Sequence, residues 1–126
     1  MWVSRVLECE PGANITAELD VDPALPLFAG HFPGHPVLPG VIIMEALAQT
    51  ASFCALVGRD EPGVLGFFAG IDKAKFRHQV QPGDVLTLKA DIVKNSSRMV
   101  VADVQALVGD QVAATATQKY VMAKGA

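Results

Sequence analysis

Two side chains suited to acid–base chemistry stand close together in the segment FAGHFPGHPVLPGVIIMEALAQ, residues 28–49. His31 lies among prolines and glycines, and Glu45 follows fourteen residues later among apolar residues. A histidine titrates near neutral pH, so a stiff loop that carries one is a common way to present a general base. A carboxylate in apolar surroundings costs free energy unless it has partners. The segment therefore indicates proton transfer, with His31 as base and Glu45 as acid.

The element that must position Glu45 is a helix. Residues from Val41 to Val57 are apolar or small at almost every position, with Pro39 and Gly40 at the entry and Gly58 at the exit. Because this helix is apolar nearly all round, we expect it to be surrounded by the rest of the protein. At its N-terminus, free N–H groups and the positive end of the dipole can bind an oxyanion, and Gly40 lets a substrate approach the backbone closely.

A narrow polar stripe interrupts this apolar helix. Glu45, Gln49 and Ser52 are spaced i, i+4 and i+7, so they share one face, and Gln49 can hold Glu45 by a hydrogen bond. A structural glutamate bonded to loop amides is the alternative interpretation. A metal site at His31 and His35 has little support, because Pro33 and Gly34 interrupt the helical spacing and no third ligand is near. For His35 we expect no chemical role.

The remaining chain is predicted to form strands. Apolar and polar residues alternate in NITAELDV and VLTLKADIV, as in half-buried strands. Proline-glycine pairs at 11–12 and 82–83 predict tight turns, the second of type II. The proline-rich stretch 22–40 predicts an ordered loop. The segments expected as strands are residues 5–9, 14–21, 64–76, 85–93, 99–108 and 112–122.

Short turns between such strands imply antiparallel neighbours. An antiparallel β-sheet wrapped around one long central helix, at about 41–57, indicates an α+β protein with the hotdog fold, although the periodicity fits another α+β arrangement as well. No repeat or linker divides residues 1–126, so a single domain is expected. Edge strands of such sheets commonly pair between subunits, and we therefore expect a homodimer.

Composition excludes several classes of protein. The chain has 126 residues, a formal net charge of −3, 51% hydrophobic and 18% charged residues, which argues against a disordered chain or a nucleic-acid binder. Cys9 and Cys54 are too few for a disulfide framework, and the first residues lack the pattern of a signal peptide, so a cytoplasmic protein is expected. Pro39, Glu45 and Gln49 inside the apolar run 37–57 favour a buried helix over a membrane span.

Two blocks of this sequence resemble a known family. GHFPGHPVLPGVIIMEALAQ is similar to the signature of the β-hydroxyacyl-acyl-carrier-protein dehydratases of bacterial fatty-acid synthesis, and FFAGIDKAKFRHQVQPGD is similar to their second block. The resemblance runs from about Arg5 to Met122. It implies a hotdog fold, a dimer or trimer of dimers, a tunnel for the acyl chain at the dimer interface, and no cofactor. The family usually has a further aromatic N-terminal block, so part of the pocket wall or carrier-protein contact is expected to differ here.

The resemblance also assigns roles to residues. It implies His31 as catalytic base, Glu45 of the other subunit as catalytic acid, and the Gly40 N–H as donor to the thioester carbonyl. Residues expected to contact the substrate are Phe32, Pro39, Val41, Gln49 and Phe68. A basic strand at the tunnel mouth is expected to dock the acidic acyl carrier protein through Lys73, Lys75 and Arg77, which alternation along the strand would place on one side.

Alternatives remain at this stage. Glutamate rather than aspartate at position 45 favours a plain dehydratase over the related enzyme that also isomerises its product. The acyl chain could belong to polyketide or aryl-polyene synthesis, and coenzyme A could replace the carrier protein. A hotdog thioesterase and a non-catalytic acyl-carrier- or lipid-binding subunit are the two other classes. The histidine fourteen residues before Glu45 favours a dehydratase over these two classes.

Overall fold

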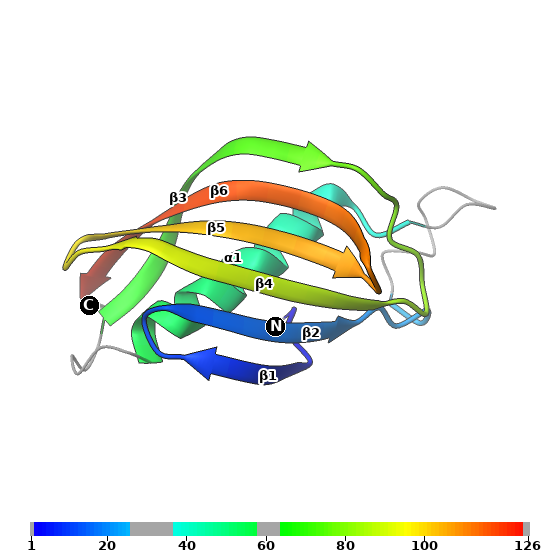
Figure 1. Ribbon diagram of the computed structural model, residues 1–126, viewed down its shortest axis with the longest axis horizontal. Coiled ribbons are helices and arrows are strands. Elements are labelled where there is room, and N and C mark those ends of the chain that lie inside the picture. The colour runs from blue at the N-terminus through cyan, green and yellow to red at the C-terminus, as the bar shows by residue number, and fades with distance from the viewer. Residues whose placement is uncertain (1, 26–36, 58–63, 125–126) are drawn as a thin grey trace.

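One antiparallel sheet and one helix make up the computed structural model, which describes residues 2–25, 37–57 and 64–124. The strands are hydrogen-bonded in the order β1-β2-β4-β5-β6-β3, and the sheet curves around the helix (Figure 1). This confirms the predicted architecture. The elements are β1 (Arg5–Glu10), β2 (Asn14–Asp20), α1 (Gly40–Val57), β3 (Val64–Phe76), β4 (Val85–Asn95), β5 (Met99–Val108) and β6 (Gln111–Lys124).

Both predicted proline-glycine turns form. Gly12 and Gly83 have φ values of 74° and 93°, which suit glycine at the third position of a type II turn after proline. The Asp84 N–H donates to the Gln81 carbonyl at 3.1 Å and so closes the second turn. The first turn joins the paired strands β1 and β2, and the second leads the chain into β4.

The core lies between α1 and the concave face of the sheet. Alternate residues of the middle strands point at the helix, as the two-residue period predicts. Many of them are alanines, which allow the helix to approach the sheet closely. Buried residues of this interface are Ala46, Leu47, Ala51 and Ala55 of α1, Leu86, Leu88 and Ala90 of β4, Ala102 and Ala106 of β5, and Ala114 and Ala116 of β6.

The prediction that α1 would be surrounded is wrong for the single chain. The sheet covers one side of the helix, whereas the other side stays exposed, with 73% of Val41 and 49% of Val57 accessible. An all-apolar sequence carries no sign of which face the sheet covers, because every face is suited to burial. By length and composition α1 could cross a membrane, as core helices of other proteins also could, and half of its residues are buried inside the structure.

Strand β3 is not a regular strand. Its pairing with β6 shifts between Asp72 and Lys75, and Lys73 has a φ of 57°, so the strand contains a bulge there. The bulge interrupts the regular alternation predicted along this strand, although Lys73, Lys75 and Arg77 still line one groove, as predicted. No residue type in this part of the sequence marks the bulge, since Lys73 is not a glycine.

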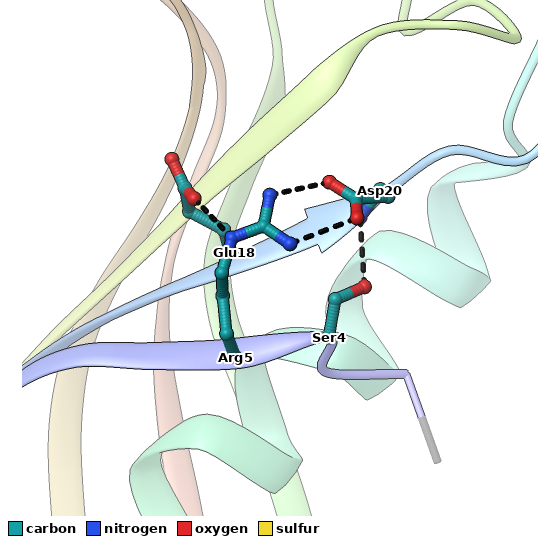
Figure 2. A network of polar contacts seen from close by, with 4 residues as sticks. All are labelled: Ser4, Arg5, Glu18 and Asp20. Atoms are coloured by element: carbon teal, nitrogen blue, oxygen red, sulfur yellow. Dashed lines mark hydrogen bonds and ion pairs between the residues drawn. The ribbon is translucent and has the colours of Figure 1, made fainter.

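An ionic network ties the edge strand β1 to β2 (Figure 2). Arg5 donates from Nε to Glu18 at 2.7 Å and from its two terminal nitrogens to Asp20 at 2.8 and 2.6 Å. The Asp20 N–H donates to Ser4 Oγ at 2.9 Å. The hydrogen bonds from Arg5 lower the pKa of Asp20 below its usual 3.8. The network is therefore intact above that pH and is lost as the pH falls through the lower pKa of folded Asp20.

We expect Arg5→Ala to loosen β1 without unfolding the protein. These side chains are exposed, so their contribution to global stability is small. Hydrogen exchange of the β1 amides should become several-fold faster near neutral pH, while exchange in β4 and β5 stays unchanged. Arg98→Ala, which removes an arginine from the β4–β5 connection, is the matched control. Unchanged exchange of the β1 amides in Arg5→Ala would show that the backbone ladder alone holds this strand.

Candidate active site

Backbone hydrogen bonds of Leu38 and Pro39, the two residues before α1, hold the N-terminus of the helix in place. The Leu38 N–H donates to the carbonyl of Val80 at 2.7 Å, and both side chains are buried. The carbonyl of Pro39 accepts N–H groups from Ile42 and Ile43 at 3.0 and 3.3 Å. The first N–H groups of an α-helix have no partner within it, so those of Gly40 and Val41, which come before Ile42, can serve an anionic or polarised oxygen.

Gly40 lies against the ring of Phe76, the last residue of β3. A Cβ atom on Gly40 would come within 2.7 and 2.8 Å of two ring carbons. A larger residue at this position would therefore have to displace the Phe76 ring, a constraint that the sequence analysis missed. Phe76 is 55% exposed and stands beside the helix N-terminus.

We expect Gly40→Ala to cost about 1 kcal/mol of stability, because its methyl group would displace the Phe76 ring. Urea unfolding of the single variants and of the double variant with Phe76→Ala measures the effect. In the Phe76→Ala background the same substitution should be nearly neutral, since the obstructing ring is gone. Equal costs in both backgrounds would rule out this steric explanation.

Glu45 lies on the exposed side of α1, one turn from the N-terminus, and not in the buried setting that the sequence suggested. Gln49 donates from Nε2 to Glu45 Oε1 at 3.4 Å, the contact expected from their spacing. The backbone N–H of Trp2 donates to Gln49 Oε1 at 2.6 Å. Because this donor occupies the amide oxygen, the amide nitrogen of Gln49 must face Glu45. The chain before β1 therefore orients the side chain that holds the carboxylate.

The exposed side of α1 forms a continuous stripe. Its members recur every four residues, the spacing of one helix face, and are apolar at both ends and polar in the middle. Ser52 is half-buried beside this stripe. We call these residues the α1 stripe: Val41, Glu45, Gln49, Phe53 and Val57.

Two predicted site residues, His31 and Phe32, lie outside the described residues, as does His35. Pro39 is half-buried at the start of α1. Phe68 of β3 is 39% exposed and packs against Tyr120, with ring centroids 5.8 Å apart.

Lys73, Lys75 and Arg77 line one groove on the outer face of the sheet, although the bulge breaks their regular alternation. The groove has a volume of about 390 Å³ and also contains Asp91 and Asp103. It is thus a mixed-charge groove rather than a purely basic patch. In the described part of the chain, no group of three or more His, Cys, Asp or Glu side chains is placed to hold a metal ion.

A buried polar pair that the sequence analysis missed supports the turn of α1 that carries Glu45. Gln118 of β6 is fully buried and donates from Nε2 to the Met44 carbonyl at 3.0 Å. The hydroxyl of Tyr120 donates to Gln118 Oε1. Burial raises the pKa of Tyr120 above its usual value, which keeps the hydroxyl protonated. The period of two in VAATATQKYVM could have placed both residues on the helix-facing side of the strand.

The sheet wrapped around a single helix, with a carboxylate on the helix, defines a hotdog-fold protein. Solved structures agree: a dehydratase heterocomplex from Xenorhabdus doucetiae has a TM-score of 0.81 at 17% identity, covering 98% of this chain and 84% of that one. A thioesterase from Staphylococcus aureus has a TM-score of 0.75 at 15% identity, covering 95% and 92%. At such low identity these likenesses establish the fold and not the reaction.

Sequence comparison then gives the family. The model of the FabA-like domain matches residues 1–117, and this chain belongs to that family. Relatives named 3-hydroxyacyl-[acyl-carrier-protein] dehydratase FabZ include one from Ruminiclostridium cellulolyticum, 47% identical over 124 residues, covering 98% of this chain and 87% of the relative. Another, from Symbiobacterium thermophilum, is 41% identical over 126 residues, covering 100% and 89%. The family resemblance predicted from the two sequence blocks is confirmed.

Proposed function

We propose that this chain removes water from 3-hydroxyacyl thioesters carried on acyl carrier protein and yields trans-2-enoyl thioesters, in fatty-acid synthesis in the cytoplasm. The observation that carries the proposal is the exposed Glu45 carboxylate, oriented by Gln49 beside the N-terminus of α1. Membership of the FabA-like family and the names of relatives at 41–47% identity support it.

The proposed chemistry uses three groups of the protein. His31 takes the proton from the α-carbon, and the N–H groups at the start of α1, with Gly40 first, stabilise the negative charge that develops on the thioester oxygen. Glu45 gives its proton to the departing hydroxyl, which leaves as water. Contacts to the acyl chain are proposed for Phe32, Pro39, Val41, Gln49 and Phe68.

The active form is proposed to be a homodimer in which His31 of one subunit works with Glu45 of the other. Two observations support the proposal that a second copy of the chain covers the α1 stripe. The stripe exposes Val41, Phe53 and Val57 on either side of Glu45, a composition typical of an interface. Strand β3 is a free edge of the sheet that exposes Phe68 and Ile71. A trimer of such dimers is the larger assembly that the family resemblance implies.

We propose the groove lined by Lys73, Lys75 and Arg77 as the contact for the acidic carrier protein. Lys75→Glu is expected to raise KM for a carrier-bound substrate roughly tenfold, whereas KM for the same acyl group on a short pantetheine thioester should not change. Arg98→Glu, which makes the same change of charge in the β4–β5 connection, is the control. A KM that rises equally for both substrates in Lys75→Glu would place the effect in the acyl site and contradict docking.

Incubation with a crotonyl thioester distinguishes the three classes of function. Hydration to the 3-hydroxybutyryl thioester, the reverse of the proposed reaction, is the expected result. Release of free thiol without hydration would instead identify a thioesterase. Binding without either reaction would identify a non-catalytic acyl-binding subunit.

A further inference from the structure

The two cysteines of the chain meet at one place, where the end of β1 approaches the last turn of α1. Cys9 lies in the edge strand β1, is partly buried and packs against the core. Cys54 lies in the last turn of α1 and is fully buried. They are 45 positions apart in the sequence, so only the fold brings them together.

Backbone contacts hold α1 against the end of β1 at this point. The N–H of Gly12 donates to the Cys54 carbonyl at 2.9 Å, and the Cys54 thiol donates to the carbonyl of Glu10 at 3.5 Å. Cys9 immediately precedes Glu10 and pairs across the ladder with Ile15, which belongs to the core. Because paired residues point to the same face of a sheet, the Cys9 side chain is directed toward α1, where it interacts with the Cys54 thiol.

The two thiols differ in reactivity. Burial, together with the neighbouring Cys9, raises the pKa of the Cys54 thiol to about 11. Cys54 is therefore protonated at neutral pH and shielded from reagents in solution. Cys9 is partly accessible, so an oxidant from solution reaches Cys9 first.

We propose that Cys9 and Cys54 are a modification site, at which a peroxide produces a reversible disulfide that links β1 to α1. The Cys9 thiolate attacks the peroxide, which breaks the O–O bond, forms a sulfenic acid and releases the other oxygen as hydroxide or alkoxide. The sulfur of Cys54 then displaces the hydroxyl of that sulfenic acid, which leaves as water with the Cys54 proton. The two thiols lose two electrons, and the peroxide gains them. A dithiol reductant reverses the reaction by thiol exchange.

The disulfide is expected to raise thermal stability, because it closes a loop from residue 9 to residue 54 in the unfolded chain. Edge strand β1 has a ladder partner on one side only, so a covalent link to α1 also suppresses its local opening. We expect the oxidised protein to melt about 10 °C higher than the reduced protein. This inference does not depend on the proposed catalytic function.

The test treats the full-length protein with hydrogen peroxide and maps its peptides without reduction. Trypsin is unsuitable on its own, since no lysine or arginine lies between Arg5 and Arg59 and both cysteines stay in one peptide. A protease that cleaves after glutamate separates them at Glu18 and Glu45. The expected result is one cross-linked pair of fragments, lighter by two hydrogen atoms than the sum of the free fragments, and a higher Tm that dithiothreitol abolishes.

Two variants serve as controls, Cys9→Ser and Cys54→Ala, and neither should show the cross-link or the peroxide-dependent rise in Tm. Three results would overturn the proposal. They are disulfides that join Cys9 of two different chains, conversion of Cys9 to a sulfinic acid without a cross-link, or two thiols that both remain free after treatment. A cross-link that forms but leaves Tm unchanged would contradict the proposed stabilisation by loop closure.

Discussion

Glu45→Gln is expected to lower kcat for hydration of a crotonyl thioester by about 10²–10⁴-fold, the usual contribution of a general acid or base. The amide keeps the size and the hydrogen bond to Gln49. It can neither protonate a departing hydroxyl in dehydration nor accept the proton of the attacking water in the hydration that is measured. Because Glu45 is exposed in the chain, the substitution should leave the fold intact. Steady-state kinetics measures kcat, and a circular dichroism spectrum of the same sample checks that the fold is intact.

The control for this variant is Glu8→Gln, which removes an exposed carboxylate from β1, away from the α1 stripe. It should retain the kcat of the unmodified protein. If Glu45→Gln were as active as Glu8→Gln, Glu45 would not be the acid. An equal loss in both variants would point to net charge rather than to proton transfer.

Tyr120→Phe is expected to destabilise the protein by about 1–3 kcal/mol, because it leaves Gln118 Oε1 buried without its donor. The phenylalanine keeps the ring contact with Phe68, so the loss reports the hydroxyl alone. Urea unfolding gives the free energy, and the Tm should fall by several degrees.

A double-mutant cycle with Gln118→Leu separates the hydrogen bond from packing. Gln118→Leu alone leaves the Tyr120 hydroxyl buried and unpaired, whereas the double variant removes both polar groups. The double variant should therefore cost less than the sum of the single variants. Additive costs would show that the two side chains are not energetically coupled.

Much of the fold follows from local sequence pattern. The period of two in NITAELDV and VLTLKADIV predicts β2 and β4, since alternate residues must face a core. The proline-glycine pairs predict two turns because only glycine adopts the required positive φ at low cost. The helix predicted at 41–57 begins one residue earlier, at Gly40.

Other features depend on contacts between distant residues, which periodicity does not encode. The bulge at Lys73 arises where β3 pairs with β6, and no glycine marks it. The Phe76 ring approaches Gly40 closely only because β3 ends beside the start of α1. Cys9 meets Cys54 only because the fold places β1 against the end of α1.

For the candidate site, the sequence predicts the residue types and the Gln49–Glu45 contact, because helical spacing alone brings those side chains together. It does not predict that the Trp2 backbone orients Gln49, since that bond joins residues 47 positions apart. Nor does it predict that the sheet leaves the Glu45 face of α1 open, because valine, phenylalanine and alanine suit either face.

Mixing two inactive variants tests the proposed composite site most directly. His31→Ala and Glu45→Gln subunits are unfolded together, refolded at equal amounts and assayed with a crotonyl thioester. If each site takes His31 from one subunit and Glu45 from the other, every mixed dimer has one intact site and one doubly altered site. Half of the dimers are mixed, so about a quarter of the activity of the unmodified protein should return. Mixed samples that stay as inactive as either variant alone would contradict the shared site.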